Sequence, residues 1–120
     1  MGSGREHWER VEAIEALGAR GDAAAVPELA AVLGDGEKEC WHTRTAALRA
    51  LVRLGAVETA PAVLRLLARD SDPDTREAAI EALAAFRYDR AARLLERIAT
   101  DAAHPHLAAA ARRALERLRG

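Results

Sequence analysis

Apolar residues recur three and four positions apart in three stretches of the chain that align with one another. The stretches are residues 10–17, 44–51 and 76–83, and their final leucines lie 34 and then 32 residues apart. A fourth stretch, residues 108–115, lies 32 residues further on and keeps the last alanine and leucine. The spacing predicts helices with one buried face. Repetition at a nearly fixed period predicts stacked copies of one structural unit.

A second apolar stretch follows each of the first three, and turn signals separate the two. Gly21 and Gly55 come directly after the first two helices, where a residue with positive φ commonly ends a helix. Arg87 stands at the equivalent place in the third copy. The pattern therefore predicts seven helices. Their expected ranges are residues 7–20, 23–33, 40–54, 57–69, 73–86, 88–101 and 105–118.

These helices predict an all-α fold, a right-handed solenoid of about three and a half antiparallel helix pairs. We set residues 1–4 apart as a cloning remnant and expect one domain over residues 5–120. The last helix has Arg112 where the other copies have Ile or Leu, which suits a solvent-facing end. The expected repeats are residues 5–37, 38–71 and 72–103, followed by a capping helix at 104–120.

The Asp-Pro-Asp-Thr-Arg turn that begins residues 72–83, and its counterpart at 41–48, carry a family resemblance. Both segments resemble the HEAT-like repeats of the bilin-lyase type. The resemblance extends over nearly the whole chain and implies stacked antiparallel helix pairs. It also implies an interaction surface, since that family mostly supplies such surfaces and some members work on tetrapyrrole-carrying partners.

Composition excludes several classes of protein. Half of the residues are apolar, and the formal net charge is −1 with 18 basic and 19 acidic side chains. A disordered tail would be less apolar, and nucleic-acid binding would call for a basic surface. No apolar run is long enough for a transmembrane helix and no signal peptide is visible, so we expect a cytoplasmic protein without a membrane partner.

Arginine accounts for all but one of the basic residues, because Lys38 is the only lysine. Together with the abundance of alanine, this bias is typical of a GC-rich bacterial gene or of computational design on a helical backbone. We take design as the working hypothesis.

The residues with the most varied chemistry lie at the turns that begin the first helix of each repeat. Aligning the copies places Glu6, Cys40, Asp72 and His104 in one column, with Trp41 and His42 directly after the cysteine. Both tryptophans, all four histidines and the single cysteine therefore lie on one rim of the predicted solenoid. Those residues are His7, Trp8, Cys40, Trp41, His42, His104 and His106.

Cys40 is the candidate metal ligand of this rim, because unpaired N–H groups at a helix N-terminus favour a thiolate. Residues 33–40 resemble the proximal loop of the cysteine-ligated monooxygenase cytochromes, through Gly34, Gly36, Lys38 and Cys40. The loop departs from that pattern at Leu33, which replaces a Phe, and at His42, which replaces a Gly. The resemblance implies a haem (heme) whose iron binds the Cys40 thiolate.

A haem bound there would need an apolar slot and partners for its propionates. We expect Trp8 and Trp41 to pack on the ring, beside His42, and Arg44 to meet a propionate, with Arg5 and Arg10 as further candidates. Peroxidase-like or carbene-transfer activity would follow from an open distal site. The plain alternative is that both tryptophans fill the rim of the core.

Three other functions remain open from the residues alone. A HEAT-like scaffold would bind a protein, or a second copy, on its concave second-helix face, with no cofactor and no catalysis. Zinc would require four converging ligands, and His104 lies two repeats beyond His42. A Cys–His nucleophile would need His7, since residues two apart on a helix do not face each other.

Overall fold

The computed structural model describes residues 3–34 and 40–120, with the side chains of residues 3–7 outside that description. Seven α-helices lie within these residues, as the sequence predicts, and no strand accompanies them. Their bounds are α1 Ser3–Arg20, α2 Val26–Gly34, α3 Trp41–Arg53, α4 Ala60–Arg69, α5 Pro73–Ala85, α6 Ala92–Ala99 and α7 Pro105–Arg119.

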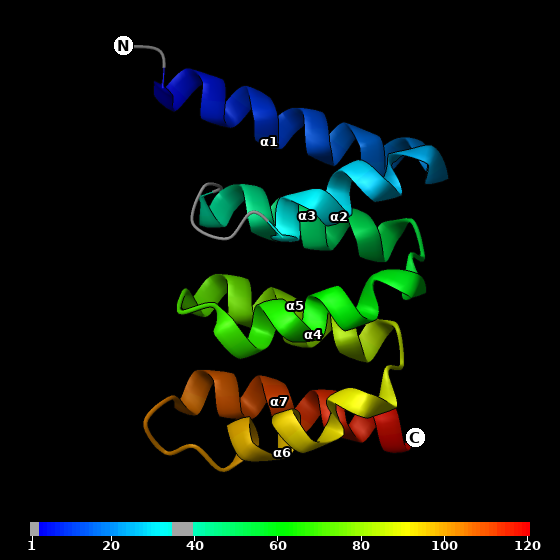
Figure 1. Ribbon diagram of the computed structural model, residues 1–120. Coiled ribbons are helices and arrows are strands. Elements are labelled where there is room, and N and C mark those ends of the chain that lie inside the picture. The colour runs from blue at the N-terminus through cyan, green and yellow to red at the C-terminus, as the bar shows by residue number, and fades with distance from the viewer. Residues whose placement is uncertain (1–2, 35–39) are drawn as a thin grey trace.

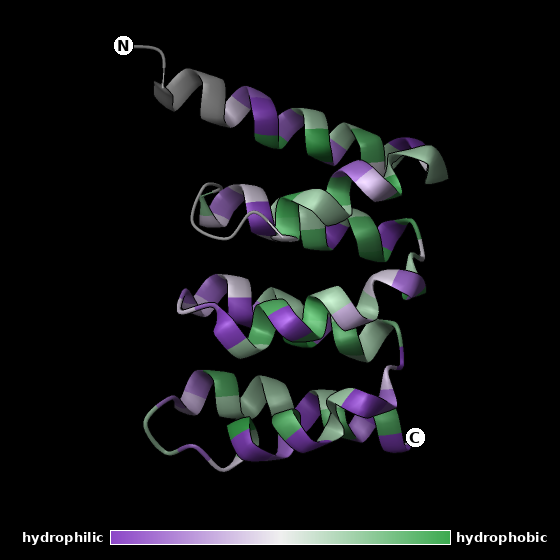
Figure 2. Cartoon of the chain, in the orientation of Figure 1, coloured by the Kyte–Doolittle hydropathy of each residue, from purple (hydrophilic) through white to green (hydrophobic). Residues whose placement is uncertain are grey.

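The helices form two layers. α1, α3, α5 and α7 make the first layer, and α2, α4 and α6 make the second (Figure 1). Each second-layer helix packs mainly against the first-layer helix that follows it in the chain, so α2 lies beside α3 and α4 beside α5. Apolar surfaces face one another between the helices and polar surfaces face outward (Figure 2). The predicted α-solenoid is confirmed.

The turns after the first-layer helices use the left-handed conformation. Gly21 and Gly55 have φ of 69° and 65°, and Arg87 has φ of 55° at the same place in the third repeat. After α3, the amide of Ala56 donates to Leu51 O at 3.0 Å. After α5, the amide of Tyr88 donates to Leu83 O at 3.1 Å. These are the bonds of a Schellman motif.

The second-layer helices begin later than the sequence suggests, because a short 3₁₀ turn precedes each of them. The turns are η1 Ala23–Ala25, η3 Val57–Thr59 and η4 Asp89–Ala91. In contrast, α1 begins at Ser3, inside the segment that we set apart as a cloning remnant.

Alanine and glycine allow the first-layer helices to lie close together. A Cβ built on Gly18 of α1 would lie 2.9 Å from the Cα of Ala50 on α3. That distance is shorter than real Cβ contacts, so only glycine fits this crossing as it stands. Gly18 and Ala50 therefore allow α1 and α3 to pack closely at this crossing.

Two neighbouring residues at the end of α4 bind two different helices. Arg69 donates from Nη2 to the carbonyl oxygen of Leu33 on α2 at 2.7 Å. Asp70 lies with Oδ2 2.9 Å from Nε of Arg44 on α3, and both side chains are about nine-tenths buried. The C-terminus of α6 is held in a similar way, because Arg112 donates to Ala99 O at 3.0 Å.

Candidate functional site

The rim predicted from the aligned repeats is present at three of its four positions. Cys40, Asp72 and His104 are the N-cap residues of α3, α5 and α7. Glu6 differs, because α1 begins three residues before it and leaves it inside a helix. The chain therefore does bring chemically varied residues to one end of the first-layer helices.

Cys40 is the N-cap residue of α3 but does not accept the backbone hydrogen bond that an aspartate accepts at this position. In α5, Asp72 Oδ2 accepts from the amide and the hydroxyl of Thr75, at 2.8 and 2.9 Å. In α3, Cys40 Sγ lies 3.5 Å from Thr43 Oγ1, and its side chain makes no cap bond to a backbone amide. The thiol is free of disulfide and partly exposed. Residues 35–39 of the haem-type loop lie outside the described residues.

Trp8, Trp41 and His42 form an aromatic cluster that joins α1 to α3. The ring of His42 stacks on Trp41, with centroids 3.5 Å apart and an interplanar angle of 30°. The same ring lies 5.0 Å from Trp8 at a tilt of 50°. Trp8 remains 54% exposed and Trp41 37%, so neither tryptophan fills the core.

A hollow of about 350 Å³ opens beside this cluster. It brings together Trp8, Trp41 and His42, three of the five residues predicted to form a cofactor site. Cys40 and Arg44 are not among its lining residues, and the guanidinium of Arg44 is held by Asp70 inside the protein. The other lining residues are Val11, Glu15, Thr45, Ala46, Arg49, Asp74, Glu77, Ala78 and Glu81.

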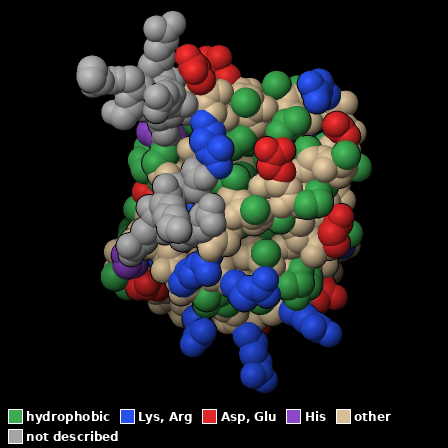
Figure 3. Space-filling model, turned by 45° about the horizontal axis from the view of Figure 1, so that its top comes forward, with side chains coloured by type: hydrophobic (Ala, Val, Ile, Leu, Met, Phe, Trp, Pro, Cys, Tyr) green, Lys and Arg blue, Asp and Glu red, His purple; other side chains and the backbone are tan. Residues whose placement is uncertain are grey.

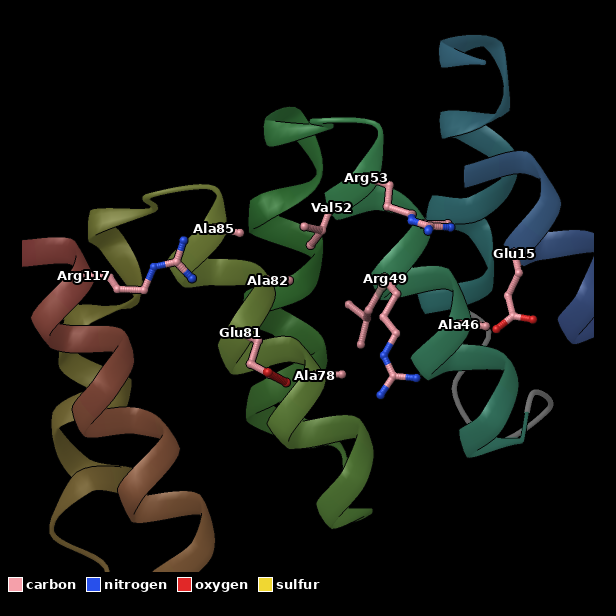
Figure 4. A pocket seen from close by; sticks show the side chains of 12 residues that line it. Glu15, Ala46, Arg49, Val52, Arg53, Ala78, Glu81, Ala82, Ala85 and Arg117 are labelled. Atoms are coloured by element: carbon pink, nitrogen blue, oxygen red, sulfur yellow. The ribbon is translucent and has the colours of Figure 1, made fainter. Parts of the chain in front are cut away.

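A second hollow, of about 530 Å³, continues the first along α3. The two share Glu15, Ala46, Arg49, Ala78 and Glu81. Figure 4 shows Glu15, Arg49 and Glu81 on three neighbouring helices around this space. We call the two hollows together the α3 groove, because α3 runs along it between α1 and α5; α7 contributes Arg117 at one end.

The charge in the α3 groove changes sign from one end to the other. Asp74 and Glu77 lie at the end beside the aromatic cluster. Arg53 and Arg117 line the other end. Sequence reasoning missed this groove, although the signal was present. Aligning the copies on their leucines gives a column in which acidic and basic residues alternate, namely Glu15, Arg49, Glu81 and Arg113.

The second-helix face, where we expected a partner, also has a hollow, of about 530 Å³. The hollow found there is lined by Arg93, Glu96, Arg97 and Thr100, which belong to α6 and the residue after it. In Figure 3, arginine side chains gather toward the lower edge of the face. Exposed arginines on α4 and α6 include Arg65 and Arg69 as well as the two that line this hollow.

His104 and His106 have partners of their own near α7. His104 Nδ1 lies 3.0 Å from Asp101 Oδ2, and the amide of Ala103 donates to Asp101 Oδ1 at 2.9 Å. The hydrogen bond with His104 and then that amide hold the pKa of Asp101 below its usual value. His106 Nε2 contacts Glu77 Oε2 on α5.

These contacts do not converge on a metal site. In the part of the chain that the structure describes, no group of three or more His, Cys, Asp or Glu residues could hold a metal ion. The His7 side chain, which we considered for zinc and for a Cys–His pair, is outside that part. None of the described helices is both long and apolar enough to cross a membrane.

Comparison with known families agrees with this architecture. The HEAT-repeat pattern matches residues 4–72 and again residues 37–116. The chain belongs to the HEAT-repeat family. Curated proteins and solved structures yielded no match. HEAT repeats commonly mediate contacts between proteins, and the chain is a helical-repeat scaffold of this kind.

Proposed function

We propose that this HEAT-repeat protein holds a peptide segment of a partner protein in the α3 groove. The proposal rests on the charges that line the groove, which are acidic at one end and basic at the other. Asp74 and Glu77 lie at one end and Arg53 and Arg117 at the other. A segment with a basic residue at one end and an acidic residue at the other would match both ends.

The small side chains that α3 and α5 contribute to the groove suit a main chain. Ala46 and Ala78 line both hollows, and Ala82 continues the row. Small side chains allow another backbone to approach closely. α3 has 13 residues and is therefore about 20 Å long. An extended peptide of about six residues covers that length.

Helix dipoles do not cancel these charges. The N-termini of α3 and α5 each contribute about half a positive charge at the aromatic end. Asp74, Glu77 and two further carboxylates line this end, against Arg49 and a combined dipole charge of about one. At the opposite end, the positive charges of Arg53 and Arg117 exceed the partial negative charges at the C-termini of α3 and α5.

Nuclear magnetic resonance provides the test. Three blocked hexapeptides would be titrated into ¹⁵N-labelled protein: acetyl-RAAAAE-amide, acetyl-RAAAAR-amide and acetyl-EAAAAE-amide. We expect the first to bind most tightly. Its amide shift changes should map to α1, α3 and α5, and to the residues around Arg117 on α7.

Matched variants locate the site. Arg53→Glu with Arg117→Glu should weaken binding of the dipolar peptide by about ten-fold, the effect of losing two partly exposed ion pairs. Arg65→Glu with Arg93→Glu makes the same charge change on the second-helix face and should leave binding unchanged. No shift change at millimolar peptide, or changes confined to α4 and α6, would overturn the proposal.

Haem ligation by Cys40 is a second candidate. It is supported by the thiol at the N-terminus of α3, which is partly exposed and forms no disulfide. Hemin would be titrated into the reduced protein, into Cys40→Ala and into His42→Ala. A Soret band with a thiolate-type shift in the ferrous CO complex, lost only in Cys40→Ala, is the expected result. If hemin produces no Soret band, or if Cys40→Ala retains the band, Cys40 is not a thiolate ligand of haem.

A further inference from the structure

Among the residues that line the aromatic end of the α3 groove, carboxylates outnumber cationic side chains. Four carboxylates line this hollow, and Arg49 is the cationic side chain among its lining residues. Glu77 contacts His106. Among the residues that the structure describes, no ion pair joins Arg49 to Glu15, Asp74 or Glu81.

The same hollow exposes both tryptophans of the chain. Trp8 is 54% and Trp41 37% exposed, and with Val57 they are the exposed large hydrophobic side chains among the described residues. Exposed apolar surface grouped at one place commonly marks a binding site. His42 contacts both indole rings, at 5.0 Å and 3.5 Å between centroids, and so fixes the spacing of this wall.

A flat cation fits a hollow with aromatic rings on one wall and carboxylates on another. A cation is attracted to the face of an indole ring. An anion would be repelled by the carboxylates, and a neutral apolar group would remove them from water without replacing their hydrogen bonds. A guanidinium group stacks on aromatic faces and donates in pairs to carboxylates, which an ammonium group cannot do.

We infer that the aromatic end of the α3 groove is a recognition pocket for one arginine side chain of the bound peptide. The pocket is bounded by Trp8, Trp41 and His42 on one side and by Asp74 and Glu77 on the other. The inference rests on the proposed function, because the arginine would belong to the segment held in the groove. It adds the requirement that the residue at this end of the segment carry a guanidinium group.

Tryptophan fluorescence is a direct probe, because the two tryptophans of the chain are both in the pocket. Three blocked peptides would be compared: acetyl-RAAAAE-amide, the same peptide with Lys in place of Arg, and the same peptide with citrulline. Citrulline has nearly the shape of arginine and no charge. We expect the lysine peptide to bind about three-fold and the citrulline peptide about ten-fold more weakly than the arginine peptide.

An isosteric variant separates recognition from a structural effect. Asp74→Asn should weaken binding of the arginine peptide by about three-fold and leave the citrulline peptide unchanged. Glu96→Gln removes an equally exposed carboxylate on α6 and should change neither. Equal affinities for arginine and citrulline peptides would overturn the arginine pocket.

The arginine pocket and the proposed function fail in different ways. Equal affinities, with amide shifts still in the α3 groove and still dependent on Arg53 and Arg117, would leave peptide binding intact. Absence of any shift change in the groove would overturn both.

Discussion

The Arg87→Gly variant tests the turn that ends α5. Arg87 has φ of 55°, whereas the equivalent turns after α1 and α3 have glycine. The left-handed conformation costs an L-residue about 1–2 kcal/mol. Glycine offsets part of the gain from removing this cost, because its greater freedom in the unfolded chain lowers the free energy of unfolding by about 0.5–1 kcal/mol. The Arg87 side chain is exposed, so little packing is lost. We therefore expect the free energy of unfolding to rise by about 0.5–1 kcal/mol.

Thermal and urea denaturation, followed by circular dichroism, measure this difference. An unfolding entropy of about 2.1 cal/mol/K per residue gives roughly 0.25 kcal/mol/K for the 120 residues. The melting temperature should therefore rise by about 2–4 °C.

Two companion variants isolate the cause. Arg87→Ala removes the guanidinium but keeps a Cβ, so it should not reproduce the gain. Gly55→Arg introduces the same strain after α3 and should lower the melting temperature by a similar amount. If Arg87→Gly is neutral or destabilising, or if Arg87→Ala stabilises equally, left-handed strain is not what limits this turn.

Three further predictions concern the caps and the buried ion pair. Cys40→Asp should raise the melting temperature, because aspartate caps a helix better by about 1 kcal/mol; an unchanged value would contradict this. Asp70→Ala should lower the free energy of unfolding in urea by about 3 kcal/mol, since it leaves Arg44 buried without its partner, and adding Arg44→Met should restore much of the loss. His104→Ala should raise the pKa of Asp101 toward its usual value, measured by carboxyl ¹³C shifts. Because folding lowers the pKa of Asp101, its contact with His104 stabilises the protein at pH values above the pKa of Asp101 in the unfolded chain. This stabilisation is lost as the pH falls through the pKa of Asp101 in the folded protein.

The repeat pattern predicted the fold because helix periodicity and turn glycines are local signals. The first-layer helices were predicted to within one or two residues, apart from the start of α1. Apolar spacing alone could not distinguish the 3₁₀ turn Val57–Thr59 from the first turn of α4, because the turn leads directly into the helix. The sequence also could not show that α2 packs mainly against α3, because that contact depends on how the chain folds back in three dimensions.

The candidate site was predicted only in part. Alignment of the rim correctly grouped Trp8, Trp41 and His42, because equivalent positions in stacked repeats become neighbours. It could not show that Arg44 is bound by Asp70, which follows a different helix 26 residues later. Nor could it show that Glu77 and Glu81 of α5 also line the hollow.

The adjacent residues Arg69 and Asp70 have a consequence for how the solenoid opens. Each fixes a different element, the end of α2 through Leu33 and the start of α3 through Arg44. In a repeat protein, neighbouring units are coupled mainly through such interfaces. Fraying of the last turn of α4 would release both elements at once. Amide hydrogens at the end of α2 and the start of α3 should then exchange with solvent as one cooperative unit, although a separate repeat contributes each of them.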